Sequence, residues 1–195
     1  TVQMDDALGK VRASLAKYGY DDTLFVFTSD NGPAVADGYE DGATEAWKGV
    51  NPAHPWSGGK YGPFEGGTRV PFLVCWPGEV KPGTVSSSLL SQTDLARTLA
   101  AVVGEDVPEG SMRDSIDLSH AMIDGSPYGR TELVEQPGWG ALGFRQDNWK
   151  LVATKEPKLY DLSADPAEQN NLAAKYPMRV RQMTERLRKV LKEPN

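Results

Sequence analysis

The chain has 195 residues, of which 39% are hydrophobic, and this composition supplies enough apolar side chains for a folded core. The formal charge of −6 at pH 7 argues against a nucleic-acid partner that covers the whole surface. The single cysteine, Cys75, excludes an internal disulfide, and no segment reaches the roughly 18 apolar residues of a membrane span. We therefore expect a globular protein with no nucleic-acid partner and no membrane span.

The beginning of the chain predicts a helix followed by a strand. Apolar residues recur at spacings of four, three and four, at Met4, Leu8, Val11 and Leu15. This stripe is typical of an amphipathic helix, which we expect to end near Tyr18. The sequence LFVFTSDNG follows at 24–32, where a continuous apolar run meets a polar cluster and a glycine. Such a run predicts a strand buried on both faces.

Asp30 and Asn31 lie where this predicted strand leaves the sheet. In open α/β sheets, ligands bind beyond the carboxyl ends of the strands. Carboxylate and amide oxygens are hard ligands, which suit Ca²⁺ or Mg²⁺ better than zinc. An Asx turn that caps the strand is the alternative, and this stretch alone favours the turn.

A long segment rich in glycine and proline, residues 33–67, predicts a functional loop or lid. It contains GGKYGPFEGG at 58–67, in which the glycines let the backbone approach a ligand. Lys60 offers a compact positive charge to an anionic group, with a solvated loop lysine as the alternative. Glu65 and Arg69 are expected to have structural roles, and Arg69 is a candidate partner for a buried carboxylate.

The next segments predict a second strand and two helical elements. The sequence RVPFLVCW at 69–76 is typical of a buried strand. Thr93 and Asp94 offer a helix N-cap before an apolar face that ends at Gly104. Loop-rich sequence with one short apolar element follows from 105 to 128.

The composition then changes to short strand-like pieces separated by turn signals. These pieces lie at 131–134, 141–145, 149–152 and 158–162. Their spacing predicts an antiparallel sheet, and Pro177 is expected to open a final helix. We therefore expect an α/β fold in two parts, with an α/β portion at 1–126 and a small subdomain of antiparallel sheet plus helix at 127–195.

Taken in order, these motifs resemble the C-terminal portion of a type I sulfatase, an arylsulfatase A-like member of the alkaline-phosphatase-like superfamily. The matching pieces are TSDNG at 28–32, GK and FEGGTRVP within 59–71, WPG at 76–78, TDLARTL at 93–99, RQDNWKL at 145–151 and LYDLSADP at 159–166. The resemblance covers essentially the whole chain. It implies the C-terminal part of a mixed sheet with flanking helices, followed by a small antiparallel sheet packed by a C-terminal helix.

The resemblance also implies a function and its residues. Asp30 and Asn31 would be ligands of a catalytic Ca²⁺, and Lys60 would contact the sulfate of a sulfated small molecule or carbohydrate. Asn31 favours a sulfatase over a phosphodiesterase of the same superfamily, since relatives with two transition-metal ions tend to have histidine there. His54 is a candidate substrate-binding residue, with an ordinary loop histidine as the alternative. The family implies a periplasmic, extracellular or lysosomal-type compartment.

Some motifs of that family do not occur in the chain. The family has an N-terminal pair of aspartates for the metal and a Cys- or Ser-x-Pro-x-Arg segment, whose first residue becomes the formylglycine nucleophile. Cys75 begins a Cys-x-Pro pattern, but Glu79 stands in place of the arginine, so we expect a core thiol. We expect no sulfatase turnover from the chain alone.

A non-catalytic alternative stays open at this point. The chain would then be a sulfatase-like remnant that acts as a binding or assembly module. It would self-associate through the face that an N-terminal half would otherwise cover.

Overall fold

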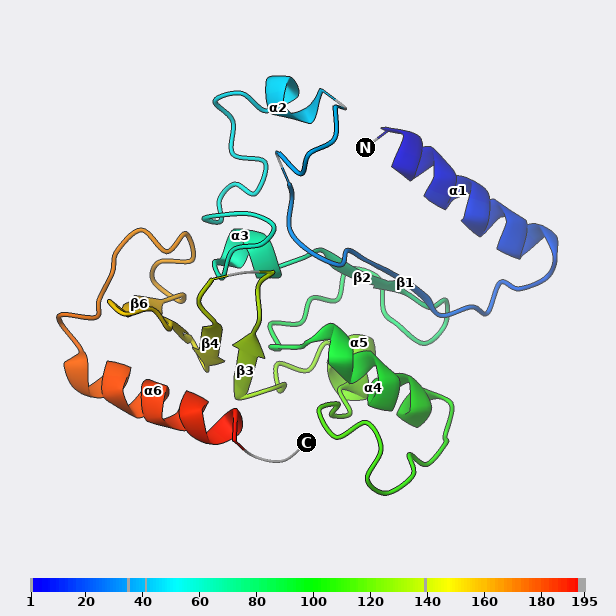
Figure 1. Ribbon diagram of the computed structural model, residues 1–195. Helices are drawn as coiled ribbons and strands as arrows, with labels where there is room; N and C mark the ends of the chain where they lie inside the picture. Colours follow the sequence, from blue (N-terminus) through cyan, green and yellow to red (C-terminus); the bar gives the residue numbers. More distant parts are fainter. Residues whose placement is uncertain (1, 35, 41, 139, 193–195) are drawn as a thin grey trace.

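The computed structural model describes residues 2–34, 36–40, 42–138 and 140–192, and Figure 1 shows their arrangement. The first part of the chain contains α1 (Val2–Lys17), β1 (Phe25–Thr28), α2 (Ala43–Ala46), α3 (Glu65–Thr68) and β2 (Phe72–Cys75). The middle contains the 3-10 turn η1 (Gln92–Asp94), α4 (Leu95–Val102) and α5 (Ser119–Ile123). The last part contains β3 (Glu132–Glu135), β4 (Gly143–Gln146), β5 (Trp149–Val152), β6 (Lys158–Asp161) and α6 (Pro177–Val190).

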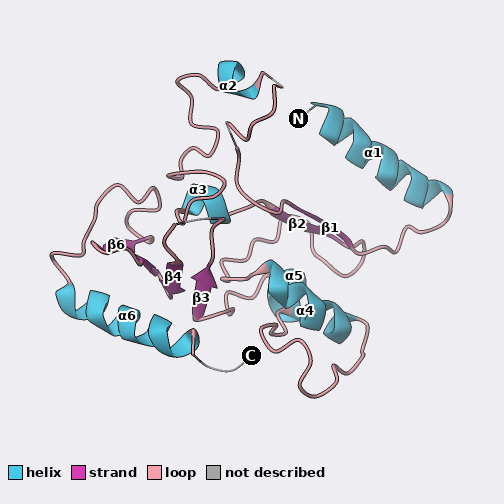
Figure 2. Ribbon diagram, in the orientation of Figure 1, coloured by secondary structure: helices cyan, strands magenta, loops and turns pink. Residues whose placement is uncertain are grey.

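The strands form two separate antiparallel sheets (Figure 2). β1 pairs with β2, with Phe25 opposite Cys75 and Thr28 opposite Phe72. The second sheet has the order β3-β4-β5-β6, in which each strand pairs with the next along the chain. The predicted α/β class, with a small antiparallel sheet and a helix at the C-terminus, is confirmed. The division near residue 126 stays a prediction.

The core of the small sheet lies on the face that α6 covers. Phe144, Leu151 and Leu159 are cross-strand partners in one row, and Met183 and Leu187 of α6 pack against them. Successive side chains of a strand point to opposite faces, so the neighbouring row lies on the other face. That row consists of Arg145, Lys150 and Tyr160, and it faces away from α6. The small sheet therefore has an apolar face toward α6 and a charged face toward the rest of the chain.

The prediction that β1 and β2 are buried on both faces is wrong for the described residues. All four residues of β1 are only half-buried, and the side chain of Leu73 in β2 is 62% exposed. Side chains of a strand project from the two faces of the sheet, so their burial depends on what packs over those faces rather than on strand pairing. Cys75 is also only half-buried, so it is not the core thiol that the sequence predicts.

Asp94 occupies the N-cap position of α4, as the sequence predicts, but its side chain makes no cap hydrogen bond to that helix. The side-chain cap belongs to η1, where the Ser91 hydroxyl accepts from Thr93 N and the Asp94 carboxylate accepts from Ser91 N. Asp94 is 2% exposed and forms a bidentate pair with Arg130, which precedes β3. No helix in the described part of the chain is long and apolar enough to cross a membrane.

Candidate functional site

The end of β1 contacts the glycine-rich loop directly. Gly32 N donates a hydrogen bond to Gly67 O at 2.9 Å. A Cβ atom at Gly32 would lie 1.8 Å from Gly66 O, so a side chain at this position has no room. The sequence therefore needs glycine where the strand end meets the loop. This contact brings the segment of Asp30 and Asn31 against the segment that carries Lys60.

A second backbone contact strengthens this approach. Lys60 N donates to Pro33 O at 3.0 Å. A Cβ atom at Gly59 would lie 2.8 Å from the same oxygen, so this glycine also permits a close approach. The structure thus joins the backbone around Lys60 to the residue that follows the strand end.

The side chains of Asp30 and Asn31 are suited to a hard cation. Asp30 is exposed and makes no hydrogen bond or ion pair with the other described residues. Asn31 Nδ2 donates to Gly32 O at 2.9 Å, which leaves the amide oxygen as an acceptor. A carboxylate and an amide oxygen match the ligand type of Ca²⁺, but Ca²⁺ takes about six to eight oxygens. Within residues 2–34, 36–40, 42–138 and 140–192, no group of three or more His, Cys, Asp and Glu could hold a metal ion. The pair therefore fits only part of a calcium shell.

Lys60 lies at a cleft of about 330 Å³. The side chain is half-buried, and its ammonium lies 5.1 Å from the ring centroid of Tyr61. Other residues that line the cleft are Pro33, Ala34, Val50, Asn51 and Tyr61. Lys60 therefore places a positive charge at the edge of a cleft beside the strand end.

His54 does not line this cleft. Its side chain is exposed, and its backbone N–H donates to Asn51 O at 3.1 Å in the preceding turn. A role for His54 in substrate binding stays a prediction.

A buried cluster of charges lies behind the glycine-rich loop, at the charged face of the small sheet. Lys150 is 0% exposed, and its Nζ lies 2.9 Å from Glu65 Oε1, 2.8 Å from Glu135 Oε2 and 3.4 Å from Glu168 Oε1. Glu65 is also 3.4 Å from Arg145 Nη1 and 3.3 Å from Arg69 Nη1. The expectation that Arg69 pairs with a buried carboxylate is confirmed, and its partner is Glu65.

The environment shifts the pKa of each acid in this cluster in its own way. Burial opposes the ionisation of Glu65, but the nearby Lys150 ammonium and Arg145 guanidinium outweigh burial and lower its pKa. Burial raises the pKa of Glu135 despite the attraction of Lys150. Burial likewise raises the pKa of Glu168 to about 7. Burial would lower the pKa of Lys150, but the three carboxylates around it raise that pKa.

No role was predicted from the sequence for Glu135, Arg145, Lys150 or Glu168. The signal for Lys150 was a lysine inside the otherwise apolar strand WKLV at 149–152. With a period of two, this lysine falls on the face opposite the apolar side chains, where it needs buried partners. The partners themselves come from distant segments, so strand periodicity alone does not identify them.

The fold and the joined motifs define a member of the alkaline-phosphatase-like class. The family model described as Sulfatase matches residues 2–105, and the chain belongs to the sulfatase family. The prediction of a type I sulfatase is confirmed.

Relatives of known type give the same assignment. The chain is 35% identical over 207 residues to the N-acetylgalactosamine-6-O-sulfatase of Bacteroides thetaiotaomicron, with 97% of this chain and 40% of that protein covered. It is 30% identical over 204 residues to human arylsulfatase A, with 88% of this chain and 38% of that protein covered. A structure solved in work on glycosaminoglycan metabolism by B. thetaiotaomicron superimposes with a TM-score of 0.89 at 35% identity, covering 96% of this chain and 43% of that one. The chain spans about two fifths of the length of these relatives and corresponds to their C-terminal part.

Proposed function

We propose that this chain supplies one edge of the active site of a sulfuric ester hydrolase. The observation that carries the proposal is the contact of Gly32 with Gly66 and Gly67, because it joins the oxygen ligands of the strand end to the lysine-bearing loop. Membership of the sulfatase family supports the reaction class. The compartment that we propose is periplasmic, extracellular or lysosomal in type.

In this proposal each residue acts on the sulfate ester through its charge. The carboxylate of Asp30 and the amide oxygen of Asn31 would be two of the ligands that hold a Ca²⁺ ion. When bound, this ion supplies positive charge that stabilises the sulfate oxygens. The Lys60 ammonium donates hydrogen bonds to a sulfate oxygen and adds a second positive charge. The formylglycine nucleophile of the family and the remaining metal ligands come from outside the motifs of this chain.

The substrate class that we propose is a sulfated carbohydrate. The relative from B. thetaiotaomicron is named for N-acetylgalactosamine 6-O-sulfate, and the structure with a TM-score of 0.89 comes from work on glycosaminoglycans. The cleft of about 330 Å³ beside Lys60 falls within the range of small-ligand sites, which begins at about 300 Å³. A sugar ring would occupy this cleft while its sulfate meets Lys60.

A chimaera tests this proposal. Residues 1–195 would replace the matching part of the N-acetylgalactosamine-6-O-sulfatase of B. thetaiotaomicron, which is 35% identical. Lys60→Ala is expected to lower kcat/KM for the sulfated sugar by about 10²–10³, the usual cost of losing a positioned donor. Lys48→Ala is the control, because Lys48 is exposed in the same loop segment and does not line the cleft. Equal activity of the two variants would exclude the assigned role of Lys60.

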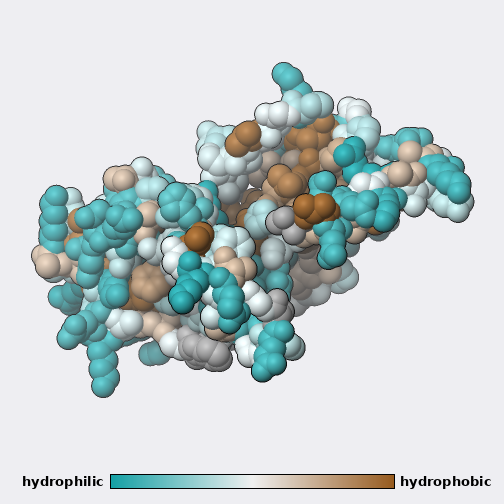
Figure 3. Space-filling view, turned by 90° about the horizontal axis from the view of Figure 1, so that it is seen from above, coloured by the Kyte–Doolittle hydropathy of each residue, from teal (hydrophilic) through white to brown (hydrophobic). Residues whose placement is uncertain are grey.

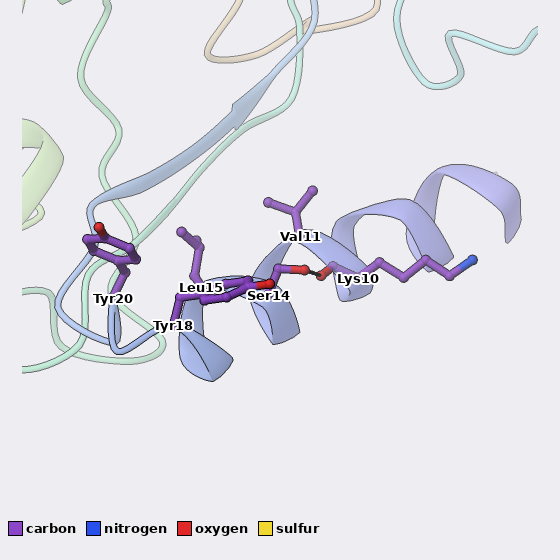
Figure 4. A pocket seen from close by; sticks show the side chains of 6 residues that line it. All are labelled: Lys10, Val11, Ser14, Leu15, Tyr18 and Tyr20. Carbon is purple, nitrogen blue, oxygen red and sulfur yellow. Dashed lines mark hydrogen bonds between the residues drawn. The ribbon is translucent and has the colours of Figure 1, made fainter.

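A second candidate function is that of an assembly module without turnover, and an exposed apolar face favours it. α1 contains no buried residue, even on its apolar stripe. Val11, which lies on that stripe, is 49% exposed. A groove of about 410 Å³ runs between α1 and the segment that leads to β1, where Figure 4 shows Val11, Leu15 and Tyr20. Apolar side chains, coloured brown, also gather near the upper middle of the surface in Figure 3, whereas its right end is mostly teal and white. We propose a second copy of this chain as the occupant, because a two-fold pair would bury the same apolar side chains from both copies.

A further inference from the structure

The loop that carries Lys60 is bound at both ends to two consecutive residues of the C-terminal part. At one end, the hydroxyl of Ser57 donates to Ala167 O at 2.5 Å. At the other end, Glu65 N donates to Glu168 Oε2 at 2.8 Å, and this bond is buried. The loop between Ser57 and Glu65 contains glycines, which give its backbone conformational freedom. The two hydrogen bonds at its ends limit its movement.

The middle of the same loop is bound to the other side of the site. Lys60 N donates to Pro33 O at 3.0 Å, three residues after Asp30. Figure 1 places α3, which ends the loop, between β2 and the small sheet. The loop is therefore held between the strand end that carries the oxygen ligands and the segment of Ala167 and Glu168.

Glu168 has a backbone conformation that needs support. Its φ is 54°, which is uncommon for a residue that is neither glycine nor asparagine. Such conformations persist where surrounding contacts fix them, and they concentrate at functional sites. Here the fixing contacts are the hydrogen bond from Glu65 N and the approach of Lys150 Nζ to Glu168 Oε1 at 3.4 Å.

Lys150 connects this support to the small sheet. It projects from β5 on the face opposite the α6 core, and it contacts carboxylates from α3, from β3 and from the segment after β6. Because the Lys150 side chain is 0% exposed, solvent does not compete with the carboxylates for its ammonium. The position of the ammonium therefore determines the positions of the carboxylates. Breaking the pairing would leave a charge buried without a partner.

We propose that Glu168 and Lys150 are positioning residues that hold the Lys60 loop against the strand end of Asp30 and Asn31. Neither residue touches the substrate in this proposal, and the consequence for catalysis rests on the proposed sulfatase function. The small C-terminal sheet then has a role in the site, because it sets the position of the sulfate-contacting lysine.

Several charges surround Glu168 in this cluster. Three buried carboxylates face the buried Lys150, and the partly exposed Arg145 and Arg69 lie beside Glu65. Burial raises the pKa of Glu168 to about 7. The titratable and charged groups around Glu168 are Glu65, Glu135, Arg145, Lys150, Tyr160 and Asp165.

Amide hydrogen exchange on the purified chain tests the proposal without metal or substrate. In Glu168→Ala, the loss of the acceptor for Glu65 N is expected to speed exchange at Lys60 N–H about tenfold, while the amides of β4 and β5 keep their protection. Glu168→Gln retains an oxygen acceptor, so it is expected to restore most of the protection. Glu185→Ala is the matched control, because Glu185 is an exposed glutamate on α6 that pairs with Arg181, away from the cluster.

Unchanged exchange at Lys60 in a folded Glu168→Ala variant would overturn the proposal. If that variant loses the protection of β4 and β5, Ser57→Ala decides, because it removes the bond at the other end of the loop. Faster exchange at Lys60 N–H in Ser57→Ala supports the proposal, and unchanged exchange overturns it. Faster loop exchange together with full sulfatase activity of the Lys60→Ala chimaera would support the positioning contacts and overturn the proposed function alone.

Discussion

Lys150 Nζ and Glu65 Oε1 lie 2.9 Å apart, with side chains that are 0% and 2% exposed. This ion pair joins β5 of the small sheet to α3 at the end of the glycine-rich loop. Its two charges are shielded from water, so each depends on the other for stability. A buried ion pair therefore connects the two parts of the chain.

Lys150→Met is expected to lower the free energy of unfolding by about 3–5 kcal/mol, because it leaves carboxylates buried without their partner. Urea denaturation followed by tryptophan fluorescence measures the change. Lys10→Met is the control, since Lys10 pairs with Asp6 in an exposed contact at 75% and 61% exposure. That exposed pair is expected to contribute less than about 1 kcal/mol. A Lys150→Met variant as stable as the control would contradict the role of Lys150 as the cation that pairs with the buried carboxylates.

The stability of the chain is expected to depend on the protonation of Glu168. Mainly through burial, the pKa of Glu168 is raised from 4.5 to about 7. Between these pH values the folded chain holds a proton that the unfolded chain has lost. This contribution is complete below pH 4.5, and it falls by on the order of 3 kcal/mol as the pH rises to about 7. Glu65 acts in the opposite direction, because its pKa is lowered and its contribution is lost as the pH falls below 4.5.

Urea denaturation at several pH values between 5 and 8 compares the native chain with Glu168→Gln. The variant lacks the titrating group, so its free energy of unfolding is expected to change less over this range. Parallel pH profiles for the two proteins would show that another group holds the proton.

Much of the fold follows from local patterns in the sequence. The strand pieces at 141–145, 149–152 and 158–162, and the proline that opens α6, were identified because periodicity and turn residues act within a few positions. The sequence predicts more burial for β1 than the structure shows. An apolar run indicates that the side chains of a strand favour burial, but it does not show which segments cover them. Burial depends on neighbours from distant segments, and sequence periodicity does not name them.

The dependence on distant segments also explains which residues of the candidate site could be predicted from the sequence. Asp30, Asn31 and Lys60 were identified from their place in motifs, and the structure joins their backbone segments through Gly32 and Pro33. The pairing of Lys150 with Glu65, Glu135 and Glu168 was not identified, because these residues are separated by up to 103 positions at the Glu65–Glu168 contact. Only the tertiary fold brings such charges together.

Gly32→Ala tests the contact between the strand end and the loop. The added Cβ would lie 1.8 Å from Gly66 O, so the loop must move, and we expect a loss of about 1–3 kcal/mol in unfolding free energy. Gly9→Ala is the matched control in α1, where an added Cβ has no atom within 4 Å. That control is expected to stabilise the chain by about 0.5–1 kcal/mol, because alanine favours a helix. Stabilisation by both substitutions would contradict the close approach at Gly32.

The exposed face of α1 predicts self-association of the purified chain. Light scattering over a range of protein concentrations is expected to show a mass that rises toward that of a dimer. Val11→Asp places a charge on the apolar stripe and is expected to keep the chain monomeric. Arg12→Asp is the control for charge, because Arg12 lies next to Val11 on an exposed part of α1 outside the groove. A native chain that stays monomeric at every concentration would argue against the assembly role.

The isolated chain is expected to bind Ca²⁺ weakly and to have no sulfatase turnover. In the proposed site, Asp30 and Asn31 would provide two of the roughly six to eight oxygens that Ca²⁺ takes, so water would fill the rest and the Kd is expected near 10⁻³ M or weaker. Calorimetric titration with Ca²⁺ measures this affinity, and Asp30→Ala is expected to abolish the binding. Asp37→Ala is the control, because Asp37 is an exposed aspartate that accepts from Tyr39 N nearby.

An aryl sulfate assay on the same purified chain completes the test. The motifs of this chain contain one cation for the sulfate and one pair of oxygen ligands for Ca²⁺, and no nucleophile that the family uses. Without the nucleophile, the charge stabilisation that we propose for Lys60 and for a Ca²⁺ ion at Asp30 would have no bond-forming step to accelerate. Turnover that depends on Lys60 would mean that the chain holds a complete site. Tight Ca²⁺ binding without turnover would mean that additional oxygens complete the metal shell, while the nucleophile still comes from elsewhere.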